Sequence, residues 1–119
     1  MTAPTADEQN VHQAAYWNGP GGERWRARQE VQDAQFAPVT ALLLARADAR
    51  AGERVLDVGC GCGDTTLAFS ERVGPGGHVT GVDISAPMLG RARQRAPAGA
   101  PVEFIQADAT THTFPRARF

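Results

Sequence analysis

Apolar and polar positions alternate in two different ways along the last two thirds of the chain. Between residues 39 and 47 an apolar side chain recurs every three or four positions, which is the spacing of one helix face. We expect this helix to open at Pro38, because a proline in the first turn loses no hydrogen bond, and to end near Gly52.

Beyond this helix, short apolar runs predict strands and are separated by segments with helical spacing. The expected strands are residues 54–58, 78–82 and 102–106, and the expected helices between them are residues 64–73 and 88–96. Ser85 stands where a side-chain cap would begin the second of these helices. Helices that alternate with strands build a parallel sheet with right-handed crossovers, so the sequence predicts an α/β fold with a Rossmann-like, doubly wound parallel sheet.

The first 37 residues have weaker patterns and form a separate unit in this prediction, with residues 38–119 as the main domain. Residues 11–17 and 29–36 are compatible with helix. Between them, Trp17 and Trp25 flank a stretch rich in glycine and proline, which predicts that large aromatic side chains are carried on a loop. These rings either pack on the domain surface or form a flap over a ligand.

A glycine-rich turn follows the first expected strand, with Gly59, Gly61 and Gly63 at alternate positions. A strand that leads through such a turn into a helix lets the backbone approach a nucleotide-like ligand. Asp64 stands where dinucleotide-binding proteins have a third small residue, and we expect it to cap the helix and repel an anion. The turn therefore suits a ligand without phosphate, unless it is only a tight turn.

Each of the three expected strands contains or precedes a carboxylate, and ligands of open α/β sheets bind beyond the carboxyl ends of the strands. Asp83 follows the glycine turn at about the 20-residue distance at which an acidic residue accepts hydrogen bonds from ribose hydroxyls. Ile84 would offer an apolar wall to a purine, and Asp108 would accept from its exocyclic amine. Taken singly, each aspartate would also suit a helix cap or a solvated loop.

The composition of the 119 residues excludes several functions. The net charge is −1 and all 12 basic residues are arginines, so neither a lysine nucleophile nor a charge pattern for nucleic acid or anionic membranes is present. The chain has no recognisable leader and no apolar run long enough to span a membrane, and we expect a cytoplasmic protein. Cys60 and Cys62 are poorly spaced for a disulfide or a zinc site and suit small loop residues in a reducing compartment.

Three segments together resemble the amino-terminal, cofactor-binding part of a class I S-adenosylmethionine-dependent methyltransferase of the small-molecule type. The matching segments are residues 55–63 (VLDVGCGCG), 79–85 (VTGVDIS) and 104–109 (FIQADA). The resemblance covers residues 38–110 firmly and the aromatic stretch more loosely. It implies S-adenosylmethionine as cofactor and a small molecule as methyl acceptor, with neither nucleic acid nor membrane as a partner.

The resemblance also assigns roles to individual residues. The backbone of the glycine turn would lie against the methionine part of the cofactor, and Asp57 would lie near its amino group. Asp83 would hold the ribose, Ile84 and Met88 would enclose the adenine, and Asp108 with Ala109 would contact its edge. The implied cofactor-binding residues are Asp57, Gly59, Cys60, Gly61, Asp83, Ile84, Met88, Asp108 and Ala109. No general base is identified.

Members of this family have a seven-stranded sheet, of which the sequence predicts only the first three strands. The strand at residues 54–58 would then be an exposed apolar edge, and we expect either a fragment of a longer protein or self-association through this edge. Two alternatives to a methyltransferase remain. One is a nicotinamide-dependent oxidoreductase, since Asp83 would suit either cofactor, and the other is a truncated, non-catalytic cofactor-binding or interaction module.

Overall fold

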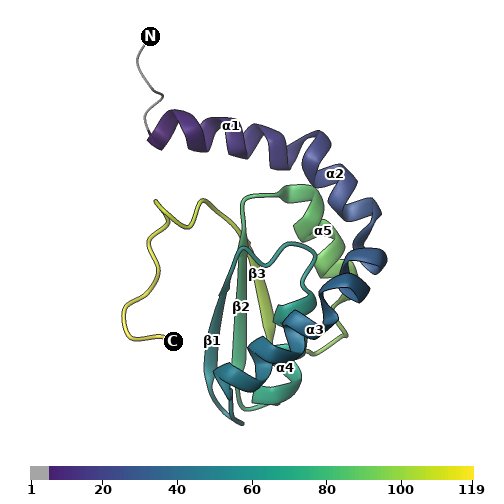
Figure 1. Ribbon diagram of the computed structural model, residues 1–119. Helices are drawn as coiled ribbons and strands as arrows, with labels where there is room; N and C mark the ends of the chain where they lie inside the picture. The colour runs from purple at the N-terminus through teal and green to yellow at the C-terminus, as the bar shows by residue number, and fades with distance from the viewer. Residues whose placement is uncertain (1–5) are drawn as a thin grey trace.

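Three short segments rich in β-branched residues form the parallel sheet of the computed structural model, which describes residues 6–119 (Figure 1). They are β1 (Arg54–Val58), β2 (His78–Asp83) and β3 (Val102–Gln106), in the order β1-β2-β3. Arg54 is paired with His78 and Val79 with Val102, so the carboxyl ends of all three strands lie at the same end of the sheet. The three strand predictions are confirmed.

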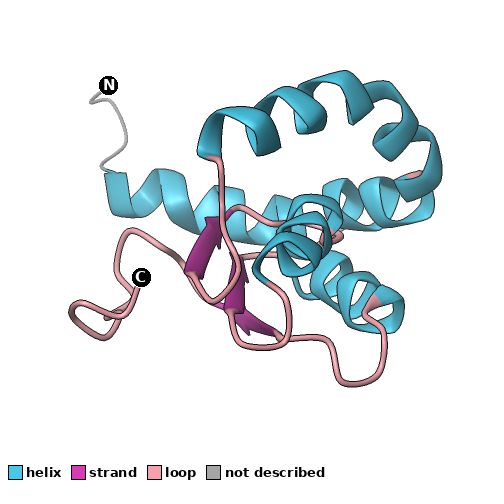
Figure 2. Cartoon of the chain, turned by 90° about the horizontal axis from the view of Figure 1, so that it is seen from below, coloured by secondary structure: helices cyan, strands magenta, loops and turns pink. Residues whose placement is uncertain are grey.

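The central strand and the helices beside it form the apolar core. α4 (Asp64–Val73) follows β1 and α5 (Ala86–Arg95) follows β2, and both lie on the same side of the sheet (Figure 2). Phe69 and Val73 of α4 pack against Val79 of β2, and Leu44 covers this cluster from the preceding helix. β1 lies at the edge of the sheet, as expected, and its last residue, Val58, is 57% exposed.

The aromatic stretch is helical, so the predicted loop is wrong. α1 (Ala6–Asn18) and α2 (Pro20–Ala27) are separated only by Gly19, and they lie beyond the carboxyl ends of the strands (Figure 1). A Cβ on Gly22 would lie 1.9 Å from the carbonyl oxygen of Trp17, and one on Gly21 would overlap the Tyr16 ring. These glycines therefore serve the close approach of two helices rather than a flexible turn.

The helix expected to open at Pro38 begins earlier. α3 spans Gln29–Ala47 without a break, with Pro38 in its interior, and ends at Asp48 in a left-handed conformation rather than near Gly52. Residues 29–37 belong to the same helix, and the apolar spacing does not show that they are continuous with residues 38–47. The expected apolar face is largely uncovered, because Val39 and Leu42 are exposed and Leu44 makes the core contact instead.

Two expectations about charged side chains are also wrong: that Asp64 caps α4, and that Arg95, which with Arg91 and Arg93 is spread around the expected helix, lies on a solvated surface. Asp64 does not cap α4: Gly63 occupies the cap position without a side-chain hydrogen bond, and the Asp64 carboxylate lies 3.7 Å from the Arg95 guanidinium. Arg95 is not a solvated surface residue, because it forms an ion pair of 2.7 Å with Asp33 and donates to the carbonyl of Cys62. It thereby ties α5 to both α3 and the glycine turn. Across residues 6–119, no helix combines the length and apolar character that a membrane span requires.

Candidate functional site

The turn after β1 is built from glycines in conformations that other residues rarely adopt. Gly59, Gly61 and Gly63 have φ angles of +75°, +55° and +88°. The N–H groups of Gly59 and Cys60 both donate to the carbonyl of Val82, at 2.7 and 3.0 Å, which fastens the turn to the end of β2. A Cβ on Gly63 would press on α5, 3.0 Å from the Ala92 side chain, whereas one on Gly59 would meet no protein atom within 4 Å. A glycine at position 63 therefore lets the turn pack closely against α5, whereas the space beside Gly59 is not filled by protein atoms.

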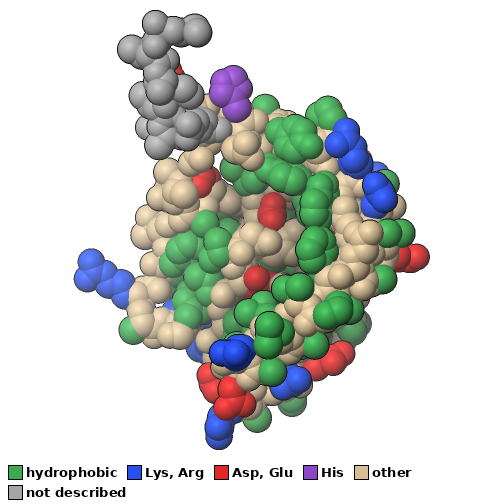
Figure 3. Space-filling model, viewed as in Figure 1, with side chains coloured by type: hydrophobic (Ala, Val, Ile, Leu, Met, Phe, Trp, Pro, Cys, Tyr) green, Lys and Arg blue, Asp and Glu red, His purple; other side chains and the backbone are tan. Residues whose placement is uncertain are grey.

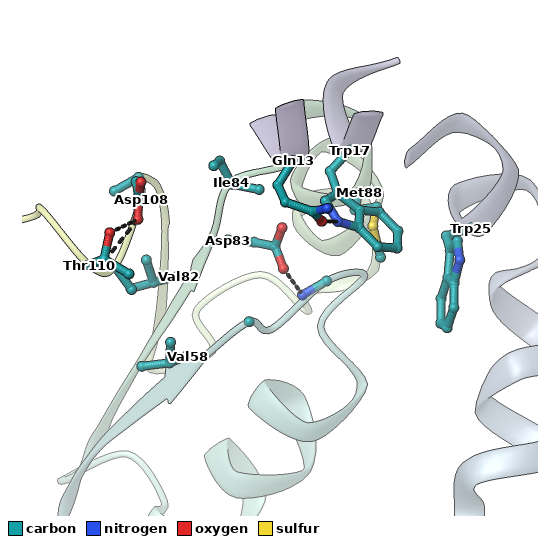
Figure 4. Close-up of a pocket in the computed structure, with 14 residues that line it drawn as sticks. Gln13, Trp17, Trp25, Val58, Val82, Asp83, Ile84, Met88, Asp108 and Thr110 are labelled. Carbon is teal, nitrogen blue, oxygen red and sulfur yellow. Dashed lines mark hydrogen bonds between the residues drawn. The ribbon is translucent and has the colours of Figure 1, made fainter. Parts of the chain in front are cut away.

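Asp83, the last residue of β2, connects the glycine turn to the start of α5. Its Oδ2 accepts a hydrogen bond of 2.8 Å from the Gly61 N–H (Figure 4), and its Oδ1 accepts one of 2.9 Å from the Ser85 N–H. An ionised carboxylate offers about four lone-pair positions, so each oxygen still has capacity to accept from a ligand. The two backbone donors also fix the carboxylate in one orientation.

A cleft of about 430 Å³ opens between the glycine turn, the carboxyl ends of the strands and the N-terminal helices. This volume lies in the usual range for small-molecule sites, roughly 300–1,000 Å³. The cleft is lined by Gln13, Trp17, Trp25, Val58, Gly59, Gly61, Val82, Asp83, Ile84, Met88, Ala107, Asp108, Ala109 and Thr110. Figure 3 shows apolar side chains around a hollow in this face, with acidic side chains among them. The charged side chains in the lining, Asp83 and Asp108, are both acidic.

The structure brings most of the residues implied by the sequence to this cleft. Those that line it are Gly59, Gly61, Asp83, Ile84, Met88, Asp108 and Ala109. Asp57 and Cys60 do not. The Asp57 carboxylate accepts from the hydroxyls of Thr65 and Thr66, at 2.6 and 2.7 Å, and so ties β1 to the first turn of α4. The cofactor contacts of all these residues remain predictions.

Asp108 belongs to a tight turn after β3. Its Oδ1 accepts from both the N–H and the hydroxyl of Thr110, and its Oδ2 accepts from the Asn10 side chain. The hydrogen bonds from Thr110, with a smaller contribution from Asn10, lower the pKa of Asp108 below its usual value. The carboxylate is therefore ionised at neutral pH and partly satisfied before any ligand arrives.

Sequence reasoning missed five of the lining residues, which are Gln13, Val58, Val82, Ala107 and Thr110. Val58 and Val82 carried a usable signal, because each is the last apolar residue before a strand-end glycine or aspartate. Gln13 carried none, since it reaches the cleft only through the position of α1. Trp17 and Trp25, which the sequence offers as a possible flap over a ligand, both reach the cleft from helices rather than from a loop.

Both cysteines of the turn are free thiols, buried, and unsuited to nucleophilic chemistry. Burial, with the nearby Asp83 and Asp57 carboxylates, raises the pKa of Cys60 from 9.0 to about 12, and burial also raises the pKa of Cys62. Within residues 6–119, no group of three or more histidine, cysteine or acidic side chains is placed to hold a metal ion.

We therefore expect the native protein to react slowly with a disulfide reagent such as dithionitrobenzoate at about pH 8, because only the thiolate attacks. Protein unfolded in guanidinium should react quickly at both thiols and serves as the control. Because the pKa of Cys60 is raised only in the folded state, the contribution of this thiol to stability is fully present below pH 9.0 and falls as the pH rises toward about 12; burial acts on Cys62 in the same direction. Rapid native reaction at either thiol would contradict the buried placement.

The parallel sheet, the strand-end carboxylates and the glycine turn define an α/β protein with a nucleotide-type cleft at the carboxyl ends of its strands. A family model described as a methyltransferase domain matches residues 55–119, more than half of the chain. The chain belongs to this methyltransferase domain family.

Curated relatives match a stretch of similar length. The chain is 50% identical over 66 residues to trans-aconitate 2-methyltransferase of Paracidovorax citrulli, a match that covers 56% of this chain and 24% of that protein. It is 44% identical over 71 residues to demethylmenaquinone methyltransferase of Thermus thermophilus, covering 59% of this chain and 32% of that protein. The matched region therefore spans no more than about a third of either relative.

Solved structures give the same result for the fold. Magnesium protoporphyrin IX methyltransferase of Synechocystis PCC 6803, with S-adenosylhomocysteine (SAH) bound, superposes with a TM-score of 0.66 at 25% identity, over 87% of this chain and 53% of that one. Coclaurine N-methyltransferase, bound to N-methylheliamine and SAH, superposes with a TM-score of 0.60 at 30% identity, over 66% of this chain and 24% of that one. The three strands and their helices thus form part of a Rossmann-like methyltransferase fold.

Proposed function

We propose that the cleft binds S-adenosylmethionine, and that the chain supplies the cofactor-binding part of an enzyme that transfers a methyl group to a small molecule. The observation that carries this proposal is the placement of Asp83. Its carboxylate lies in the cleft, is oriented by two backbone N–H groups, and keeps lone pairs for the two hydroxyls of a ribose. The match to the methyltransferase domain family supports the same conclusion.

The rest of the cleft fits an adenosine ligand with a positive charge and no phosphate. Gly59 presents bare backbone beside open space, so a ligand can approach it closely. Ile84 and Met88 supply apolar surface of the kind that a purine packs against. The acidic side chains Asp83 and Asp108 favour a cationic ligand and disfavour the pyrophosphate of a dinucleotide.

S-adenosylmethionine, when bound, supplies a methyl group on a positively charged sulfur atom, ready for in-line attack. The part of the chain described here would bind and orient the ligand rather than provide the nucleophile. The glycine turn and Asp83 would fix the ligand's position, and Trp17 with Trp25 would shield the cleft from water. An indole face also attracts a cation, which suits a sulfonium group.

The methyl acceptor is proposed to be a small molecule. The relatives and neighbours with printed substrates include proteins that act on trans-aconitate, demethylmenaquinone and magnesium protoporphyrin IX. These acceptors differ in size and charge, so they support only the broad class. The general base, where an acceptor needs one, is not assigned to any described residue.

Calorimetric titration with SAH and with NAD tests the proposal. We expect saturable one-to-one binding of SAH and no measurable binding of NAD. Binding of NAD in preference would favour the oxidoreductase alternative, and binding of neither would favour a non-catalytic interaction module. A second assay would follow labelled methyl groups from S-adenosylmethionine to a panel of small quinols, carboxylates and amines.

A further inference from the structure

α1 is attached to the rest of the protein in an unusual way for a helix. None of its described side chains is fully buried. Two of its large hydrophobic side chains, Val11 and Tyr16, are exposed to solvent. A surface helix is ordinarily held by an apolar stripe that packs on the core. Here the attachment consists mainly of hydrogen bonds from side chains to the loops that follow β2 and β3.

The first attachment is at the amino-terminal half of α1. The Asn10 side chain donates to the Asp108 carboxylate at 3.0 Å and to the Thr110 hydroxyl at 3.1 Å. Asp108 and Thr110 both line the cleft from the turn after β3. Asn10 therefore fastens α1 to one wall of the cleft.

The second attachment is at the carboxyl end of α1. The Asn18 side chain donates to the carbonyl of Ile84 and accepts from the N–H of Ala86, both at 2.8 Å, so its amide bridges the loop after β2. The Ser85 hydroxyl, in the middle of this loop, donates to the Trp17 carbonyl. Asn18 and Trp17 thus hold the segment that carries Ile84 into the cleft and that begins just after Asp83.

The side chains between these two attachments reach the cleft. Gln13 and Trp17 lie on the same helical face as Asn10, at three- and seven-residue spacings, and both line the cleft. The Trp17 ring N–H donates to the Gln13 side chain at 3.0 Å, and its ring packs edge-on to Trp25 at 6.0 Å (Figure 4). One face of α1 is therefore a wall of the cleft opposite the glycine turn.

We propose that Asn10 and Asn18 are positioning residues for cofactor binding, which fasten α1 as a wall across the two strand-end loops. This inference rests on the proposed function and deepens it. Because α1 buries little apolar surface, its attachment is weak without ligand. A ligand that contacts the assembled cleft stabilises the attached helix, and the attached helix strengthens binding by the same factor.

The test compares SAH affinity and amide hydrogen exchange in the parent protein, Asn18→Ala, Asn10→Ala and a control, His12→Ala. His12 is on α1 but exposed and outside the cleft lining. In the parent, SAH should slow exchange of the α1 amides. Asn18→Ala should weaken SAH binding about tenfold, as expected for the loss of one or two hydrogen bonds, and should remove the α1 protection while β2 amides stay protected. Asn10→Ala should act in the same direction, and His12→Ala should match the parent.

The outcomes separate the two proposals. If the parent fails to bind SAH, the proposed function is wrong and this inference falls with it. If the parent binds SAH but both asparagine variants bind SAH as tightly as the parent, the positioning role is wrong and the proposed function stands. The same holds if SAH does not slow hydrogen exchange of the α1 amides. Asn10→Ala also decides the matter if Asn18→Ala does not fold, since Asn10 lies in the other attachment.

Discussion

Replacing Asp83 by alanine is expected to weaken SAH binding by about 2–3 kcal/mol, or roughly 30- to 150-fold, because hydrogen bonds to a charged acceptor are lost. Two effects add in this variant. The ribose loses its acceptor, and the Gly61 N–H loses the partner that holds the glycine turn in place. Calorimetric titration with SAH measures the loss.

Two further variants serve as controls for Asp83→Ala. Asp83→Asn keeps one acceptor oxygen but cannot satisfy both the Gly61 and the Ser85 N–H groups, so its loss should be smaller but clear. Asp48→Asn removes a carboxylate from an exposed ion pair with Arg50, away from the cleft, and should bind like the parent. Parent-like affinity of Asp83→Ala would show that the ribose assignment is wrong.

Replacing Gly59 by alanine is expected to reduce SAH binding below detection while the protein stays folded. The added methyl group meets no protein atom within 4 Å, so it projects into the open space that the ligand is proposed to fill. The φ angle of +75° also makes alanine unfavourable there, at a cost of about 1–2 kcal/mol in folding free energy.

Gly52→Ala is the matched control for this backbone cost. Gly52 has a φ angle of +87°, its added Cβ also meets nothing within 4 Å, and it is outside the cleft lining. Both variants should lose a similar amount of stability in chemical denaturation, but only Gly59→Ala should lose SAH binding. Equal binding by the two variants would mean that the glycine turn is a structural turn and not a ligand contact.

The fold of residues 54–106 could be predicted from the sequence because local signals agree with the tertiary structure there. Short β-branched runs lie between glycine and proline breaks, and Ser85 caps α5 as its position suggests. Right-handed crossovers then leave only a few arrangements for consecutive parallel strands. The same reasoning places Gly61, Asp83 and Ile84 at the carboxyl ends of the strands, and in the structure all three line the cleft there.

The N-terminal segment could not be predicted in the same way. Gly21 and Gly22 suggest a loop by composition, but they are helical because only glycine allows α2 to approach the end of α1. The contact face of α1 consists of asparagine, glutamine and tryptophan side chains, so it has no apolar periodicity to detect. Polar attachments such as that of Asn18 depend on partners almost seventy positions away, which the local pattern does not contain.

Asp57 shows a further limit of motif-based assignment. The family resemblance predicts that it lies near the amino group of a cofactor, which stays a prediction, and the structure adds that its carboxylate accepts from Thr65 and Thr66. The sequence already contains both threonines, but their use depends on where α4 begins relative to β1. A residue's position in a motif therefore does not by itself predict its hydrogen-bond partners within the protein.

The structure of the protein with SAH bound tests most directly whether the cleft is the cofactor site and Asp83 its ribose acceptor. We expect both ribose hydroxyls within about 3.2 Å of the Asp83 carboxylate, with the adenine between Ile84 and Met88 and the amino-acid part against Gly59. Ordered ligand elsewhere on the protein, or in this cleft with the ribose turned away from Asp83, would show that the proposed binding site is wrong.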